Sequence, residues 1–599
     1  MGLGDVNMSP GRLRSKASST GHLKSRGGCK TCKIRRVKCG EEKPHCARCT
    51  TTGRKCDYEG KFSIVDTPLS LSPNTVWRER RSFAYYFQNA APSIGGGLDG
   101  DFWNTIVPQV CRNEPAVWDA IISISALFES PEPCPELFSI RRGYSRSSNA
   151  FTLNQNHQDA LSWYSRSVSA IRQRIESGRL DIFVGLITCI LFISIEAIQG
   201  GTEEGLQLYS QGVQLLLNFR VQIMTGTVPV TEAAWFKDTV VPIFIRLGSI
   251  GLPFTKGPLK SLLSITESCS TQQSDSLRHA REGLVLLSAE VQIFQLASVE
   301  YTREHGTSNI LPELTNQQTI LLARLKSWHT SVNNLMATLR SKPLTPQQIG
   351  MGSLLIANYQ ILYIILQTTL TTSQTITDKY IPNFQTIVDQ SALALAVTAR
   401  LDGTQPPYTF ELSVAYPLWF TCLRCREPRI RRKALALLRR APLVQGFHKT
   451  KSAISFSERV MALEEQYGIA INRSRNSTPE SPASGISSQS GYHGPGVSDL
   501  PTLDLAAFLE LDFEYSTSLE SMPIELGMVP ISEIIPEEAR MGPINVFRPM
   551  DGFPSGTTAK DLAKWNPGSD QMFLRFSWNK RDLESDSWAT IYEYVPLTL

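Results

Sequence analysis

The chain has 599 residues, of which 41% are hydrophobic and 19% are charged, and its formal net charge is +5. This composition is typical of a globular protein and excludes a chain that is disordered throughout. Twelve cysteines over this length exclude a small secreted disulfide scaffold. At about 150 residues per domain, we expect three or four domain-sized parts, or one large domain with appendages.

The first residues, MGLGDVNMSPGRLRSK, contain no apolar run, so we expect no secretory signal peptide. The longest apolar stretch, residues 182–195, is shorter than the roughly 18 residues needed to span a bilayer. It therefore predicts a buried core helix, and we expect an intracellular chain without a membrane partner.

The near-neutral total hides a strongly basic head. Residues 1–60 hold fourteen Lys or Arg and five Asp or Glu, a net charge of +9, which leaves −4 for the rest of the chain. We expect residues 1–24 to be a disordered basic tail. Such asymmetry indicates a polyanion partner, most often nucleic acid, although a charge run alone fits a solvated tail equally well.

Six of the cysteines lie within one short stretch of this head, spaced as two C-x2-C-x6-C halves joined by six residues. They are Cys29, Cys32, Cys39, Cys46, Cys49 and Cys56. Paired C-x2-C hooks are typical of tetrahedral zinc sites. Two such sites need eight ligand positions, which six thiolates supply if two of them bridge both metals. The spacing therefore predicts two Zn²⁺ ions per chain.

The cysteines allow two other interpretations. In the first, Cys29, Cys32, Cys46 and Cys49 hold a single zinc, which leaves the repeated x6 spacing unexplained. In the second, the six cysteines form disulfides, which conflicts with the expectation of no signal peptide. The spacing favours two metals over both alternatives.

The segment CKTCKIRRVKCGEEKPHCARCTTTGRKC, residues 29–56, resembles the binuclear Zn2Cys6 cluster of fungal transcription regulators. The resemblance covers all six cysteines, the basic run after Cys32 and Pro44. It implies a DNA-binding domain at residues 25–60, with Cys29 and Cys46 bridging the two zincs. It also implies that a short helix after Cys32 enters the major groove and reads CGG-type triplets.

Residues 33–38, KIRRVK, would occupy that helix. Lys33 and Lys38 suit phosphate contacts, and Arg35 or Arg36 suits the O6 and N7 atoms of guanine. Ile34 and Val37 are three residues apart, so we expect both on the inward face. The alternative is attraction to any polyanion without base reading.

Residues 61–76 carry two prolines and read as a linker, with no heptad run to predict a coiled coil. A symmetric homodimer is therefore left open. Residues 77–470 show helical periodicity and breakers such as Gly200-Gly201, which predicts a large all-α domain. Expected helices lie within residues 102–128, 160–175, 182–199, 206–217, 311–339, 354–370 and 434–438. Stretches such as ERRSFAYYF (79–87) and LITCILFISIEAIQGG (186–201) resemble the regulatory domain of the same fungal proteins.

Several other patterns compete for a function. The glycines of the GxGxxG at residues 95–100 follow no strand, so we expect a loop. Cys422 and Cys425 read as packed core thiols rather than a redox or metal pair. Glu196 ends an apolar helix, where packing is favoured over effector binding. The basic run at residues 429–440 reads as a solvated helix face, with a nuclear-import patch as the alternative. The sequence contains no HExxH, GxSxG or P-loop motif, so we expect no enzyme.

The last third changes character twice. Residues 471–502 are rich in Ser, Pro and Gly and predict a disordered linker. Residues 503–540 are rich in acids, and DLAAFLELDFEY (504–515) within them interleaves acidic with apolar and aromatic side chains. This pattern fits either an activation segment that binds a coactivator or an amphipathic helix docked on the regulatory domain. Residues 541–599 contain three β-rich runs that predict a small antiparallel unit capping the helices.

These expectations describe a mainly α protein with a small zinc cluster, a large helical domain and a short β-rich end. They predict a nuclear, sequence-specific DNA-binding regulator of transcription by RNA polymerase II that reads CGG-like triplets. The alternative is a zinc-dependent nucleic-acid-binding protein without base specificity.

Overall fold

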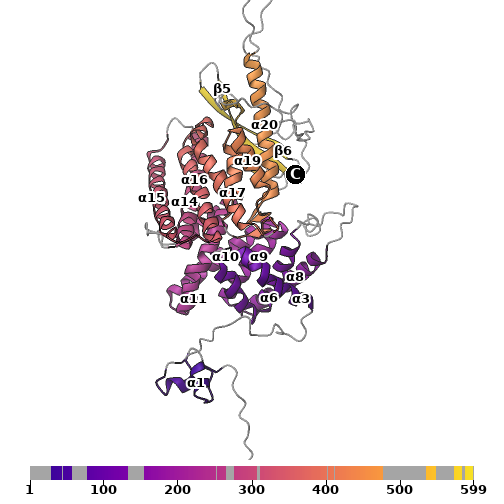
Figure 1. Cartoon of the computed structure of the whole chain (residues 1–599), viewed down its shortest axis with the longest axis vertical. Helices are drawn as coiled ribbons and strands as arrows, with labels where there is room; N and C mark the ends of the chain where they lie inside the picture. The colour runs from indigo at the N-terminus through magenta and orange to yellow at the C-terminus, as the bar shows by residue number, and fades with distance from the viewer. Residues whose placement is uncertain are drawn as a thin grey trace, which may run out of the picture. The chain divides into compact units, whose positions relative to one another are not determined.

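The computed structural model describes residues 28–42, 45–54, 56, 77–96, 98–131, 154–250, 252–264, 276–305, 310–400, 402–410, 412–476, 535–547, 572–582 and 587–597 (Figure 1). The chain divides into two compact units, Met1–Thr75 and Val76–Leu599. The expected basic tail and the linker at residues 61–76 lie outside the described residues. So do residues 477–534, which include most of the acidic segment.

The first unit contains two short helices, α1 (Lys30–Ile34) and α2 (Ala47–Thr50), which are joined by the chain that carries Cys39. Its core is formed by cysteines, with Val37 packed beside them. A domain this small cannot bury enough apolar surface to fold alone, so its stability depends on what the cysteines bind.

The second unit is built mainly of helices. We call its helical part the helical body, which is followed by a C-terminal sheet. Its first half contains α3 (Trp77–Tyr85), η1 (Tyr86–Ala90), α4 (Ala91–Gly95), η2 (Phe102–Ile106), α5 (Val107–Cys111), α6 (Pro115–Glu129), α8 (Gln155–Glu176), α9 (Ile182–Gln199), α10 (Thr202–Met224), α11 (Val230–Trp235), η3 (Phe236–Val240), α12 (Val241–Ile250) and α13 (Leu252–Leu263).

Its second half continues the helical pattern and ends in strands. It contains α14 (Leu277–His305), α15 (Pro312–Leu339), α16 (Pro346–Thr368), η4 (Thr375–Tyr380), α17 (Ile381–Thr398), β1 (Tyr408–Thr409), α18 (Ala415–Arg424), α19 (Pro428–Leu438), β2 (Val444–Gln445), β3 (His448–Lys449), α20 (Thr450–Asn476), η6 (Glu537–Ala539), β4 (Gly542–Phe547), β5 (Met572–Asp582) and β6 (Ser587–Leu597). The prediction of a mainly α fold is confirmed. Because α20 extends to Asn476, six residues of the expected linker are helical.

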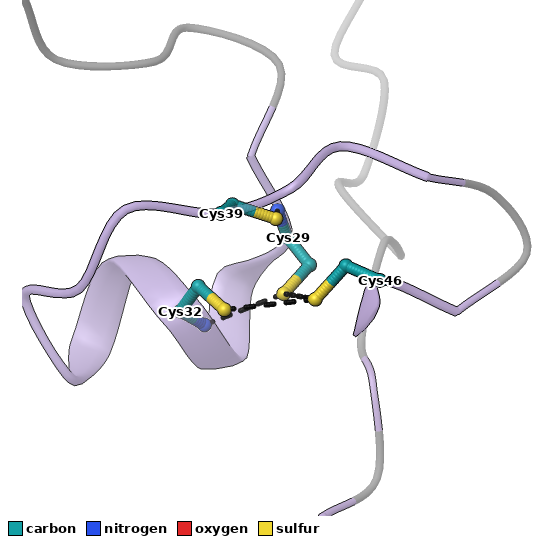
Figure 2. Close-up of side chains that lie close together, drawn as sticks. All are labelled: Cys29, Cys32, Cys39 and Cys46. Carbon is teal, nitrogen blue, oxygen red and sulfur yellow. Dashed lines mark hydrogen bonds between the residues drawn. The ribbon is translucent and has the colours of Figure 1, made fainter. Parts of the chain in front are cut away.

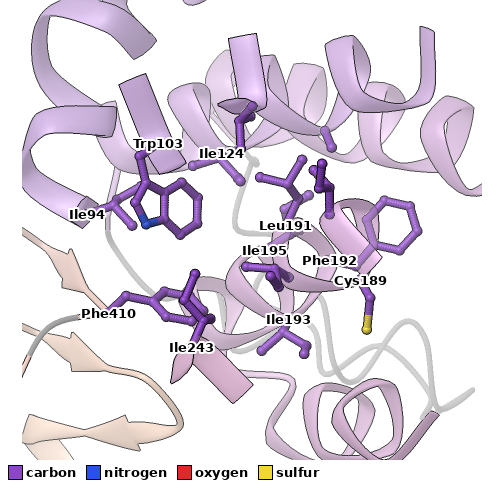
Figure 3. Close-up of a cluster of buried hydrophobic side chains, with 14 of the residues drawn as sticks. Ile94, Trp103, Ile124, Cys189, Leu191, Phe192, Ile193, Ile195, Ile243 and Phe410 are labelled. Carbon is purple, nitrogen blue, oxygen red and sulfur yellow. The ribbon is translucent and has the colours of Figure 1, made fainter. Parts of the chain in front are cut away.

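The first hydrophobic core surrounds α9, whose side chains are apolar on all faces as expected of a central helix. The Asp181 carboxylate caps its N-terminus by accepting the N–H of Phe183, and Gly200 ends it with φ of 93°. Figure 3 shows Ile193 and Ile195 of α9 in one cluster with Trp103. The predicted core helix at residues 182–199 is thus confirmed.

The second core lies among α14, α15, α16, α17, α18 and α19. Its helix α16 starts at a capping box, in which Thr345 and Gln348 each bond the other's backbone N–H. Helix α14 contributes Val285 to the first core and Leu284 to the second. It therefore forms a wall common to both cores.

Within the part of the chain that the structure describes, three helices are long and apolar enough to cross a membrane by length and composition alone. They are Ile182–Gln199, Leu277–Thr302 and Pro346–Thr368, whose apolar windows are 94%, 39% and 72% buried inside the structure. For the first and third, burial in the two cores accounts for the apolar composition.

Strands β4, β5 and β6 form an antiparallel sheet in that order. Leu574 and Phe576 of β5 pack on Val460 of α20 and Leu423 of α18 in a third apolar cluster. The predicted antiparallel unit at the C-terminal end, packed on the helices, is therefore confirmed. A second sheet of two-residue strands, β1, β2 and β3, was not predicted, because two residues carry no alternation.

Two buried carboxylates in the body each meet two arginines. The first is Asp99, which accepts hydrogen bonds from Arg246 and Arg281. Burial alone would raise the pKa of Asp99, but the two guanidiniums hold it below its usual value.

The second is Glu464 of α20, which accepts from Arg426 at 2.7 Å and from Arg431 at 2.6 Å. All three side chains are at most 1% exposed. Burial opposes the charged form of Glu464, yet the two arginines keep its pKa below the usual value.

These lowered pKa values predict acid-sensitive stability. A carboxyl whose folded-state pKa is depressed stabilises the fold above its unfolded pKa, about 4 for Asp and Glu, and loses that contribution as pH falls through the folded value. We expect the urea midpoint of the body, followed by circular dichroism, to change little between pH 7 and pH 5 and to fall below about pH 4. A midpoint that is constant down to pH 3 would contradict this role for Asp99 and Glu464.

Candidate metal centre and nucleic-acid interface

The two C-x2-C pairs occupy matching places at the starts of the two short helices. Cys29 is the N-cap of α1 and Cys32 lies in its first turn, while Cys46 is the N-cap of α2 and Cys49 lies within it. Figure 2 shows Cys32 on the helix and Cys39 on the chain that follows it. A helix start directs such side chains inward together because one turn separates them.

Backbone hydrogen bonds repeat between the two halves. The N–H of Cys29 donates to the sulfur of Cys39 at 3.3 Å, and the N–H of Cys46 donates to the sulfur of Cys56 at 3.3 Å. Likewise, Lys33 N–H bonds Cys29 O, as Thr50 N–H bonds Cys46 O. The sequence repeat is thus a structural repeat.

The sulfur atoms form two groups of four. Cys29, Cys32, Cys39 and Cys46 lie within 4.8 Å of one another, and so do Cys29, Cys46, Cys49 and Cys56. The two groups share Cys29 and Cys46, which are the two cysteines that the resemblance implies as bridges.

The sulfur–sulfur distances suit zinc. Cys29 lies 3.7 Å from Cys46 and 3.6 Å from Cys49, and Cys32 lies 3.7 Å and 3.8 Å from the same two. Four thiolates at about 2.3 Å from a tetrahedral zinc lie roughly 3.8 Å apart. A single site held by these four cysteines would also fit these distances, but it would leave Cys39 and Cys56 without a role although each lies in one of the two groups.

Burial raises the pKa of the Cys32 thiol to about 12. A buried all-sulfur set of this kind needs cations to exist as thiolates, and soft thiolate ligands select zinc among the available divalent metals. The donor set therefore fits a binuclear zinc cluster.

The comparison with known families agrees with this geometry. Residues 27–63 match the model of the fungal Zn(2)-Cys(6) binuclear cluster domain. The chain therefore carries a fungal Zn2Cys6 domain. This domain binds two zinc ions, as predicted, and together with relatives that are named as transcription regulators it supports a DNA-binding transcription regulator. The prediction that the chain is not an enzyme is confirmed by the same comparisons.

Curated relatives support this assignment. It is 23% identical over 378 residues to "Transcription regulator lscL" of Purpureocillium lilacinum, covering 57% of this chain and 86% of the relative. It is 74% identical over 34 residues to "Aspercryptin biosynthesis cluster-specific transcription regulator atnN" of Emericella nidulans, covering 6% of each. It is 51% identical over 142 residues to "Sterol uptake control protein 2" of Saccharomyces cerevisiae, covering 24% and 14%. The chain thus spans less than two thirds of the last two relatives, and no solved structure matches it.

The structure corrects the extent of the helix in the Zn2Cys6 domain that was expected to carry the basic run. Helix α1 ends at Ile34, Arg35 is its C-cap, and Arg36 has a left-handed φ of 56°. The turn forms because the chain must fold back to bring Cys39 to the cluster. Arg36 and Lys38 therefore follow the helix rather than lying on it.

Because of the same turn, Ile34 and Val37 do not share an inward face, so that prediction is wrong. Ile34 is 72% exposed, while Val37 packs against the cysteines. The left-handed residue between them breaks the helical spacing that would have placed both side chains on one side. In the described part of the domain, Ile34 is thus an exposed apolar side chain beside basic ones.

The four predicted DNA-binding residues are not equivalent. Lys33, Arg36 and Lys38 are exposed, whereas Arg35 is half-buried and donates from Nη1 to Thr52 Oγ1 at 3.3 Å. Arg35 is thereby tied to the second half of the domain.

Two residues with structural roles in the domain carry no signal that predicted those roles. Gly53 adopts φ of 59° in the second half, at the place that Arg36 occupies in the first. Glu42 accepts the N–H of Ala47 at the start of α2 at 3.0 Å, and this bond holds the pKa of Glu42 below its usual value. Aligning the two halves residue by residue would have revealed the pairing of Arg36 with Gly53.

In the second basic run, Arg429, Lys433, Arg439 and Arg440 are exposed, as a solvated face predicts, but that prediction is wrong for Arg431. This residue is buried against Glu464 because α19 packs on α20. Arg432 pairs with Glu465, Lys433 with Asp389 and Arg439 with Glu458. Four of the six cations thus belong to ion pairs of the body, which weakens the alternative of a nuclear-import patch.

The other competing patterns prove to be structural. Cys422 and Cys425 are buried thiols, and burial raises the pKa of each to about 12. Glu196 is buried and accepts the hydroxyl of Tyr164 at 2.7 Å, which agrees with packing. The glycine motif begins at Gly95, the last residue of helix α4, so a helix and not a strand precedes it.

Proposed function

We propose that the chain is a sequence-specific regulator of transcription by RNA polymerase II, that it acts in the nucleus, and that it reads CGG-like triplets in double-stranded DNA. The observation that carries this proposal is the unequal distribution of basic side chains over two structurally equivalent halves of the zinc domain.

The backbone repeat makes each residue of the first half equivalent to the residue seventeen positions later, as Cys29 is to Cys46. The first half holds Lys33, Arg35, Arg36 and Lys38, and the equivalent residues are Thr50, Thr52, Gly53 and Lys55. Metal binding requires the cysteines of both halves alike. It does not require the excess of cations after α1, which therefore indicates the surface that meets DNA.

The strain at Arg36 supports its role as the principal base reader. A non-glycine residue in the left-handed region costs roughly 1 kcal/mol, and the second half avoids this cost with Gly53. Among the described residues, the Arg36 side chain is exposed and no hydrogen bond or ion pair holds it. Its guanidinium is thus available for the bidentate contact that arginine makes with guanine.

The zinc ions would be held by Cys29, Cys32, Cys39, Cys46, Cys49 and Cys56, with Cys29 and Cys46 bridging. Bound zinc would supply the folding free energy of the domain. With six thiolates and two Zn²⁺ counted, residues 1–60 keep a charge of about +7, enough for attraction to phosphate. Lys33 and Lys38 would contact phosphates on either side of the base reader.

We further propose the division of the chain that its sequence predicts. Residues 77–470 would form the regulatory domain, and the acidic stretch would bind a coactivator. Residues 535–540 of that stretch are docked on the body, so the candidate activation segment is reduced to residues 503–534. A homodimer without a coiled coil remains part of the proposal.

The experiment is selection of DNA ligands from a random pool by the full chain, together with zinc counted per chain. We expect enriched CGG triplets and two zincs. Binding without sequence enrichment would favour the general nucleic-acid-binding alternative, and one zinc per chain would overturn the binuclear assignment.

Two variants separate base reading from folding. Arg36→Gly is expected to lose about 1–3 kcal/mol of preference for the selected site over scrambled DNA, while the domain resists zinc chelation at least as well as the wild type because the left-handed strain is relieved. Lys33→Ala is expected to weaken binding to both DNAs alike. Competition binding and a chelator titration measure the two effects. Unchanged site preference in Arg36→Gly would refute its assignment.

A further inference from the structure

Residues 535–541, which we call the strap, connect the undescribed stretch 477–534 to the C-terminal sheet. The strap includes η6 and leads directly into β4. It lies against three parts of the helical body: the chain entering η4, the end of α18, and α20. Glu537, Arg540 and Met541 make these contacts.

The carboxylate of Glu537 is held by four donors. It accepts the backbone N–H groups of Gln374 at 2.7 Å and Thr375 at 2.8 Å, the hydroxyl of Ser373 at 3.1 Å and the amide of Asn579 at 2.6 Å. Three of these donors belong to the segment entering η4. Backbone and side-chain donors together thus bind the carboxylate at this position.

Arg540 is completely buried and forms a bidentate ion pair with Asp378 of η4, with both hydrogen bonds at 2.7 Å. Its remaining donors reach the carbonyls of Ile535 at 2.8 Å and Gln374 at 3.3 Å. The planar fork of arginine is what matches a carboxylate in this way, and lysine would not reproduce it.

Met541 is recognised through its backbone. Its N–H donates to Glu464 at 2.7 Å and its carbonyl accepts from Arg426 at 3.1 Å. The same Glu464 carboxylate pairs with Arg431, so the backbone of the strap contacts the buried ion pairs of Glu464. The side chain of Met541 completes the apolar cluster with Val460.

We infer that the helical body carries a docking site for the strap, which binds an acid at position 537, an arginine at position 540 and the backbone at position 541. We call these three contacts the lock. The lock holds the C-terminal sheet on the body even when the connecting stretch 477–534 is cut. The acidic segment is then a connection fixed at both ends, at α20 and at the strap, and not a free tail. The inference does not depend on what the zinc domain reads.

Two forces could hold the C-terminal part: the apolar cluster under the sheet and the polar lock of the strap. The apolar cluster depends on the burial of several hydrophobic side chains together, whereas the lock depends on single charged residues. Substituting one lock residue therefore separates the two contributions.

The experiment uses the full chain with a site for a sequence-specific protease introduced within residues 482–492. After cleavage under native conditions, size-exclusion chromatography shows whether the fragment that begins after the cut stays bound. The wild type, Arg540→Gln, Glu537→Gln and the control Lys580→Gln are compared, since Lys580 is an exposed cation of β5 outside the lock. Circular dichroism of each uncut chain verifies its helical content.

We expect the two wild-type fragments to co-elute, and the fragment of Arg540→Gln to dissociate at least tenfold faster, with Lys580→Gln unchanged. If uncut Arg540→Gln has lost its helices, the comparison is read from Glu537→Gln, where the same release is expected. Separation of the wild-type fragments on cleavage would overturn the docking site. Equal retention in all four chains would overturn the lock and assign the attachment to the apolar cluster.

Discussion

Replacing Cys46 with serine is expected to remove both zinc ions from the chain, whereas replacing Cys56 should lower the zinc content from two to about one. The reason is that Cys46 belongs to both groups of sulfur atoms and Cys56 to only one. Structural zinc contributes on the order of 10–16 kcal/mol of apparent binding free energy in small zinc domains, so Cys46→Ser should also abolish DNA binding.

Zinc per chain, measured by elemental analysis after dialysis, tests this expectation. Cys134→Ser, a cysteine distant from the cluster in sequence, serves as the control and should retain two zincs. Equal zinc loss in Cys46→Ser and Cys56→Ser would show that Cys46 is not a bridge, and loss of zinc from Cys46→Ser with none from Cys56→Ser would favour the single-site arrangement.

The second large effect is expected at Glu464, for which Glu464→Gln should destabilise the helical body by about 3–5 kcal/mol. The amide keeps the size of the side chain but leaves the guanidiniums of Arg426 and Arg431 buried without a counter-charge. It also replaces the acceptor of the Met541 N–H. Removing one partner of a buried ion pair costs far more than the pair contributes over apolar packing, because the desolvated charge remains.

Urea unfolding of the full chain, followed by circular dichroism, measures the change. The matched control is Glu458→Gln, which breaks the ion pair with Arg439 on the body surface and should cost less than about 1 kcal/mol. If both glutamines lower the midpoint equally, the buried position of Glu464 has no special role. The double variant Glu464→Gln with Arg431→Met should recover part of the loss, since one unpaired charge is then removed.

Much of the candidate site was predictable because it depends on residues close in sequence. The repeated cysteine spacing predicted two metals, since ligands must surround each ion within a short reach of chain. The all-apolar run at residues 182–199 predicted a central helix, and the three β-rich runs predicted the C-terminal strands. Each of these features follows from a local pattern with a known period.

The basic run shows where local reasoning failed. Helical spacing placed Ile34 and Val37 on one face, but the return of the chain to Cys39 ends α1 at Ile34 and turns Arg36 to positive φ. The gathering of the cysteines, and not helix propensity, determines the backbone there. A comparison of Arg36 with Gly53 in the other half could have revealed the turn from sequence.

The sequence by itself determined the grouping of the six cysteines, the basic surface of the first half, the central helices and the strands, because these depend on spacing within a few turns of chain. Only the tertiary structure decided that Arg431 is buried against Glu464, that Arg35 is tied to Thr52, and that the strap reaches Asp378. Charges such as these look alike along the chain, whether solvated or buried. Their partners lie far away in sequence, so the packing of α19 on α20 and of the strap on η4 assigns each one its role.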